Sequence, residues 1–70
     1  MNTGIVKMFN NNKGFGFITP DNGGEELFVH FKEIQMDGFK KLKRDQQVKF
    51  KIAKGDKGAY ATNVEVIAND

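Results

Sequence analysis

The chain contains no cysteine, no serine and no tryptophan, and only one histidine and one proline among its 70 residues. Without cysteine it can form neither a disulfide framework nor a cysteine-based zinc site, a composition that fits a reducing compartment. It also lacks the usual nucleophiles of acyl-transfer enzymes. His30 with scattered carboxylates is a poor ligand set for a metal ion, and the adjacent Glu25 and Glu26 would point to opposite faces of a strand. We therefore expect no enzyme, no metal and no cofactor.

Long apolar runs are absent as well. No stretch approaches the roughly 20 apolar residues of a membrane span. Residues 1–5 have neither the basic flank nor the apolar run of a signal peptide. We expect a cytoplasmic protein with a single domain over residues 1–70, and a domain this short should be only marginally stable.

The net charge is small, but the positive and negative charges are unevenly distributed along the chain. The net charge is +2, yet residues 1–31 carry −1, residues 32–57 carry +5 and residues 58–70 carry −2. Such a basic segment can be an ordinary solvated surface, or it can be a landing surface for a polyanion such as nucleic acid. The charge distribution alone leaves both interpretations open.

Short apolar runs alternate with turn residues, a pattern typical of an all-β barrel or sandwich. Turns rich in Asn, Gly and Pro are expected at residues 10–14, 20–24 and 55–58. Strands are expected over residues 4–10, 14–19, 26–30, 47–54 and 60–67, with a short helical turn near residues 31–34 followed by a long loop. No segment has a sustained helical period. Because five short strands would leave exposed edges, we expect the sheet to close on itself.

Strict alternation along two of these strands places phenylalanines on one face. Phe15 and Phe17 share a face of their strand, and Phe28 and His30 share a face of the next one. These rings could form the core, where phenylalanine usually lies. We favour an exposed face, because a histidine prefers water or a partner and because other apolar residues suffice for a small core. Those residues are Val6, Ile18, Leu27, Val29, Ile34, Leu42, Val48, Phe50, Ile52 and Val64.

An exposed aromatic face marks a binding surface. Rings beside lysines suit unpaired nucleic acid, because bases stack on rings at roughly 1–3 kcal/mol per base and lysines meet phosphates. Gly14 and Gly16, between the rings, would leave the ring faces unobstructed. The alternative is a module that docks a protein partner on the same rings.

Two motifs in this region resemble the ribonucleoprotein motifs of the bacterial cold-shock proteins. They are KGFGFI at residues 13–18 and LFVHF at residues 27–31, in the family's order and at its separation. RNA-recognition motifs carry something similar to the first, but they need two helices, for which this sequence shows no pattern. Further matches at residues 3–7, 9–10, 34–35, 37–39, 58 and 63–64 extend the resemblance over essentially the whole chain.

The resemblance implies an all-β, five-stranded antiparallel OB-fold barrel that binds single-stranded RNA and DNA, preferring pyrimidine-rich stretches. It also implies an RNA chaperone that prevents or melts secondary structure and influences transcription and translation, including at low temperature. We expect a monomer without a membrane or small-molecule partner. Carried over by position, the family's binding residues are Lys7, Met8, Phe9, Lys13, Phe15, Phe17, Phe28, His30, Phe31, Phe39 and Lys57, with Asn10 and Glu26 near that surface.

The chain departs from the family's pattern at several positions. Met8 stands where the family usually has tryptophan, and a thioether contacts bases without offering a plane. Lys57 stands where some members have a planar arginine, and Ala59 replaces a usual proline, which should loosen the last hairpin. Lys43 and Arg44 replace a commonly acidic pair, which could compensate electrostatically.

Overall fold

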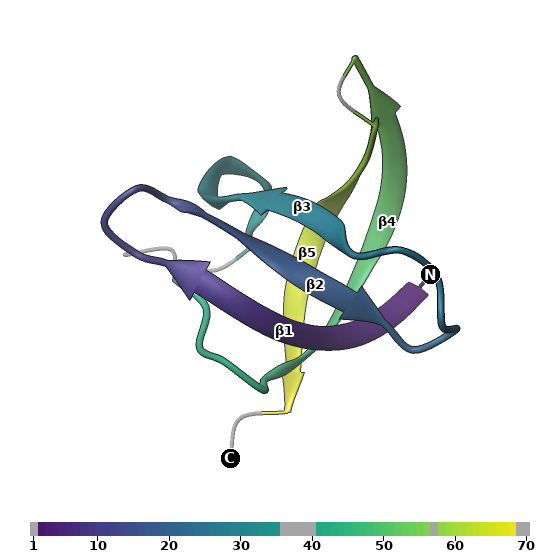
Figure 1. Cartoon of the computed structure of the whole chain (residues 1–70). Coiled ribbons are helices and arrows are strands. Elements are labelled where there is room, and N and C mark those ends of the chain that lie inside the picture. The colour runs from purple at the N-terminus through teal and green to yellow at the C-terminus, as the bar shows by residue number, and fades with distance from the viewer. Residues whose placement is uncertain (1, 36–40, 57, 69–70) are drawn as a thin grey trace.

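Five strands and one short helical turn make up the part of the chain that the computed structural model describes, residues 2–35, 41–56 and 58–68 (Figure 1). The strands are β1 (Asn2–Asn10), β2 (Phe15–Pro20), β3 (Leu27–His30), β4 (Gln47–Gly55) and β5 (Gly58–Ala68), and the 3₁₀ turn η1 (Phe31–Glu33) follows β3. All strand bounds lie within two residues of those expected from the alternating pattern. The all-β prediction is therefore confirmed.

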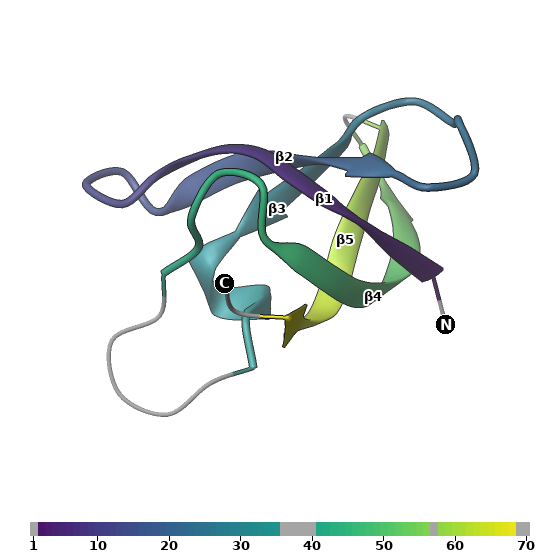
Figure 2. The ribbon, with the colours of Figure 1, turned by 90° about the horizontal axis from the view of Figure 1, so that it is seen from below.

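The strands close into a barrel in the order β1-β2-β3-β5-β4, with β4 returning to β1. Figure 2 shows the β1–β2–β3 part of the sheet lying across the β4–β5 hairpin. Four of the contacts are antiparallel, whereas β3 and β5 meet in parallel at Phe28 and Tyr60. Directions cannot alternate around a closed ring with an odd number of strands, so one parallel contact is unavoidable. Closure pairs the sheet edges that we expected to need protection.

Apolar side chains from all five strands fill the barrel. The buried core consists of Val6, Ile18, Leu27, Val29, Ile34, Leu42, Val48, Phe50, Ala61 and Val64. Nine of the ten expected core residues are buried in this core. The prediction for Ile52 is wrong, because 42% of it is exposed. Ile52 pairs with Ala61 in the β4–β5 hairpin, but the pairing of β4 with β1 ends at Phe50, so Ile52 has no β1 residue beside it.

A β-bulge in β1 changes which of its side chains face outward. Val6 pairs with Ile18 and Met8 pairs with Phe17, so Lys7 is an extra residue in the register. Met8 therefore lies on the same side of the sheet as Phe17. Phe9, opposite Gly16, turns inward instead and packs against the core.

Gly16 makes this arrangement possible. A Cβ atom at this position would lie 2.7 Å from the Cα atom of Phe9 and would also collide with the carbonyl oxygen of Met8. Only glycine lets β2 approach the bulged strand so closely. Gly16 thus serves the contact between strands, and not the unobstructed ring faces that we expected from the sequence.

Candidate functional site

Three phenylalanine rings cover the outer face of the barrel where β2 and β3 pair. Phe17 lies opposite Phe28, and Phe15 lies opposite His30. The Phe28 ring centroid is 5.9 Å from that of Phe15, with the planes 22° apart, and 6.0 Å from that of Phe17, with the planes 76° apart. Phe28 is 40% exposed, whereas Val29, the next residue, is fully buried. The prediction that alternation separates an outer aromatic face from the core is confirmed.

Phe31 and His30 extend this face past the end of β3. Their ring centroids lie 4.7 Å apart, and Phe31 is as exposed as Phe28. The Phe31 ring lies over Gly14, where a Cβ atom would come within 2.7 Å of Phe31 Cδ1 and where φ is +78°. The Phe31 N–H donates to the Gly14 carbonyl at 2.8 Å, and the Lys32 N–H donates to His30 Nδ1 at 3.3 Å. The β1–β2 turn and η1 therefore hold both rings in place.

Lys7 lies on the bulge next to Met8 and forms an ion pair with Glu26. Lys7 Nζ is 2.6 Å from Glu26 Oε2, and the two side chains are 56% and 43% exposed. An ion pair this exposed contributes little to stability. A phosphate that approaches Lys7 would therefore have to displace only the weakly bound Glu26 carboxylate.

The turn between β1 and β2 is shaped by Asn10. Its Oδ1 accepts the N–H groups of Asn12 and Lys13, both at 3.0 Å, and its carbonyl accepts the Gly14 N–H at 2.8 Å. The Asn10 side chain thus has a structural partner of its own. Lys13 is held at the exposed tip of the turn.

Part of the basic segment runs beside β1 and brings Arg44 to this turn. The Val6 N–H donates to the Gln46 carbonyl at 2.9 Å, and the Asp45 N–H donates to the Val6 carbonyl at 2.8 Å. Arg44 consequently lines a shallow polar groove. The other lining residues are Met8, Phe9, Asn10, Asn11 and Asn12.

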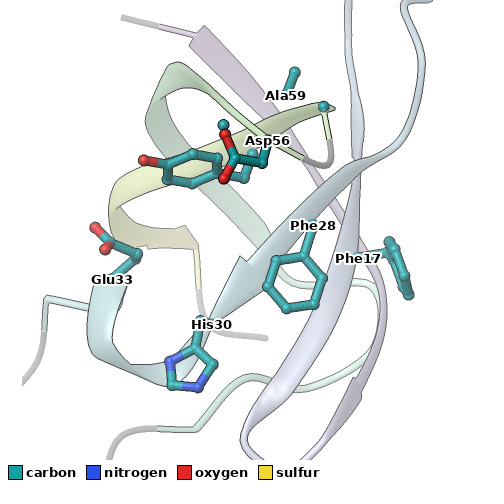
Figure 3. Close-up of a pocket in the computed structure, with 9 residues that line it drawn as sticks. Phe17, Phe28, His30, Glu33, Asp56 and Ala59 are labelled. Atoms are coloured by element: carbon teal, nitrogen blue, oxygen red, sulfur yellow. The ribbon is translucent and has the colours of Figure 1, made fainter.

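A larger hollow of about 650 Å³ adjoins the aromatic face on the side of the β4–β5 hairpin (Figure 3). Its lining residues are Phe17, Phe28, His30, Glu33, Gly55, Asp56, Gly58, Ala59 and Tyr60. We did not predict Tyr60 or Glu33 as part of the site. Tyr60 could have been found by asking which β5 residue meets β3, because closure of the ring places it directly beside Phe28.

The structure brings together most of the residues that we carried over from the family. On or beside the outer face lie Lys7, Met8, Asn10, Lys13, Phe15, Phe17, Glu26, Phe28, His30 and Phe31. Phe9 is not among them, since its ring packs against the core and reaches only the edge of the Arg44 groove. Phe39 and Lys57 lie outside the described residues. The roles of all these residues in binding stay predictions.

In the described ranges, no group of three or more His, Asp or Glu side chains is placed to hold a metal ion. No helix among the described residues is long and apolar enough to cross a bilayer.

Comparisons with known proteins agree on one family. The sequence profile of the "'Cold-shock' DNA-binding domain" matches residues 2–67. The chain is 54% identical over 67 residues to Cold shock-like protein CspA of Bordetella pertussis, covering 96% of this chain and 100% of that protein. It is 62% identical over 65 residues to Cold shock protein CapB of Pseudomonas syringae pv. tomato, covering 93% of each. The solved structure "drosophila Unr CSD456" shares the fold, with a TM-score of 0.79 at 19% identity over 96% of this chain and 26% of that one.

Proposed function

The chain belongs to the cold-shock DNA-binding domain family, and from this premise we propose that it binds single-stranded RNA and DNA, by stacking bases on its outer aromatic face. Lysine and arginine side chains around the rings meet the phosphates, and the protein catalyses no reaction. Pyrimidine-rich strands are the preferred ligands.

The observation that carries this proposal is the exposure of Phe28 and Phe31 over a core that is already filled. Neither ring is needed to close the barrel, because ten other apolar side chains are buried inside it. Adjacent exposed rings form an apolar patch, and such a patch on a small domain marks a binding surface. Unpaired bases fit it, since each base offers a face that can stack on a ring.

Stacking on the protein and pairing with another strand exclude each other. A base that lies against Phe17 or Phe28 is removed from its neighbours and from its complement. Binding would therefore prevent or melt secondary structure, which is the action of an RNA chaperone. Because RNA structure is more stable at low temperature, this activity would influence transcription and translation most strongly there.

The charges around the rings support the same ligand. Lys13 stands at the tip of the β1–β2 turn, Lys7 stands on the bulge, and Arg44 lines the groove beside Met8. Cations on two sides of an aromatic face can follow a phosphate backbone while the bases lie on the rings.

We propose that the protein acts as a cytoplasmic monomer, with one domain over residues 1–70.

Salt dependence tests the proposal. The affinity for a pyrimidine heptamer should fall as salt rises, with a log–log slope of about −0.7 for each phosphate that is neutralised. Arg44→Gln should make that slope shallower by about 0.7, because it removes one cation. A protein partner docked on the phenylalanine rings is the competing function, and its binding would be insensitive to salt. Heptamer affinity that does not change with salt would contradict our proposal.

A further inference from the structure

We propose that Asn22, in the turn between β2 and β3, is a site of spontaneous deamidation, which converts its side-chain amide into a carboxylate. Of the seven asparagines in the chain, only Asn22 is followed by glycine. In such a pair the backbone nitrogen of the glycine can attack the asparagine side chain, because no Cβ atom on the glycine hinders the approach. The reaction needs no nucleic acid and takes place whether or not the protein binds one.

Water is the only co-reactant. The Gly23 nitrogen loses its proton to hydroxide and forms a bond to Asn22 Cγ, which leaves a tetrahedral oxyanion at Oδ1. The Cγ–Nδ2 bond then breaks, and Nδ2 takes a proton from water and leaves as ammonia. Water hydrolyses the resulting cyclic imide at one of its two carbonyl groups, so position 22 becomes either an ordinary aspartate or an isoaspartate. No oxidant or reductant takes part.

A backbone donor already contacts the oxygen that would carry the negative charge. The Gly24 N–H donates to Asn22 Oδ1 at 2.8 Å. This bond closes an Asx turn, which folds the asparagine side chain back along the Gly23 peptide. A positioned donor stabilises an oxyanion more than the neutral carbonyl from which it forms. The Gly24 N–H should therefore lower the barrier to attack on Cγ.

Gly23 has the freedom that the attack requires. Its φ is +82°, and a Cβ atom added there would meet nothing within 4 Å in the described part of the chain. Its N–H donates to the Pro20 carbonyl at 3.3 Å, which is longer and weaker than the usual bond of about 2.9 Å. Residues 21–26 are all exposed, so hydroxide can reach the nitrogen and ammonia can leave.

The start of this turn is fastened to β1, which keeps the reaction local. The Asp21 N–H donates to the Thr3 carbonyl at 2.9 Å, and Thr3 Oγ1 donates to Asp21 Oδ2 at 2.7 Å. Asn22 and Gly23 lie beyond these bonds, at the exposed tip. Their backbone can rearrange while the strands stay paired, so we expect the barrel to remain folded through the modification.

Two other asparagines show why Asn22 should react first. Asn10 Oδ1 also accepts a backbone N–H two residues ahead, from Asn12 at 3.0 Å, but the residue that follows Asn10 carries a side chain. Asn63 is followed by Val64, which is fully buried and cannot turn its nitrogen toward a neighbouring amide. The polarising hydrogen bond and an unhindered, mobile nitrogen coincide at Asn22.

Ageing the folded protein in mildly alkaline buffer tests the proposal. Trypsin releases residues 14–32 as one peptide in which Asn22 is the only asparagine, so mass spectrometry assigns an exchange of NH₂ for OH to this position. We expect this peptide to change before any other asparagine-containing peptide and to include isoaspartate, which an isoaspartate-specific methyltransferase detects. The rate should rise with pH, because the attacking nitrogen must lose its proton.

Two glycine variants separate the attack from a general effect on the turns. Gly23→Ala should slow the change at Asn22 about tenfold or more, because its Cβ hinders the attacking nitrogen. Gly58→Ala is the matched control, since Gly58 also has a positive φ, +114°, but follows no asparagine. It should leave the rate at Asn22 unchanged. Asn22→Gln gives a second test, because the longer side chain must close a larger ring and its peptide should stay unmodified.

Thermal unfolding curves recorded before ageing establish that each variant is folded. A synthetic peptide of residues 14–32, aged beside the protein, serves as the clock. Protein that is still unmodified at Asn22 when the synthetic peptide has reacted completely would overturn the proposal, and so would equal rates for the wild type and Gly23→Ala. Isomerisation at Asp37 would not be mistaken for this reaction, because it leaves the mass unchanged. Since the assay contains no nucleic acid, its failure would leave the proposed function intact.

Discussion

Removing the Phe28 ring should weaken nucleic-acid binding without unfolding the barrel. The ring is 40% exposed, and its aromatic contacts are with Phe15 and Phe17 at centroid distances of 5.9 and 6.0 Å. Losing two such contacts costs about 1–3 kcal/mol of folding free energy, and because the ring is partly exposed its removal leaves no closed cavity. Truncating a buried phenylalanine would instead cost ~3–5 kcal/mol. The binding free energy for oligothymidine should fall by ~1–3 kcal/mol, a loss in affinity of about 5- to 150-fold.

Val29→Ala is the matched control, one residue along the same strand. Val29 is fully buried, so removing two methyl groups costs about 2–3 kcal/mol of folding free energy. In a domain of this size, that loss lowers the melting temperature by about 8–24 °C. At a temperature where the variant is still folded, its affinity for oligothymidine should equal that of the wild type. A folded Phe28→Ala protein that binds as tightly as the wild type would refute the stacking role of this ring.

Two further substitutions test the bulged strand. Met8→Trp should tighten oligothymidine binding by a fraction of ~1–3 kcal/mol, because it places a flat indole opposite Phe17, and unchanged affinity in a titration would show that this position does not reach the strand. Gly16→Ala should destabilise the fold by ~3 kcal/mol in a thermal or urea melt, because its Cβ would collide with the backbone of β1. Gly23→Ala, a glycine at φ +82° with nothing within 4 Å of a new Cβ, should cost only ~1 kcal/mol, and equal losses for the two variants would count against the close approach at Gly16.

The alternation of side chains made much of the fold and the aromatic face predictable. In β2 and β3 the period of two runs without interruption, so the sequence alone separates Phe15, Phe17 and Phe28 from Ile18 and Val29. The glycine- and asparagine-rich turns fixed the ends of the strands. Both signals are local, and a local signal can be read directly from a sequence.

The parts that were missed depend on how strands meet. The bulge at Lys7 shifts the register by one residue, so Met8 faces outward and Phe9 inward, and alternation along β1 cannot show this. Ile52 continues the apolar pattern of β4, but the pairing of β4 with β1 ends at Phe50 and Ile52 is left exposed. Tyr60 reaches the site only because closure of the ring sets β5 parallel to β3. Each of these positions is determined by a contact between segments that lie apart in the chain.

The most direct test of base stacking on the outer face compares one sequence in two states. A pyrimidine heptamer would be titrated into the protein as a single strand and, at the same salt concentration, as a duplex with its complement. Rings such as Phe28 and Phe31 can stack only on bases that are not already paired, while the phosphates are present in both states. We expect the single strand to bind far more tightly than the duplex. Equal affinity for the two would show that phosphate contacts alone hold the ligand, and it would contradict stacking on the aromatic face.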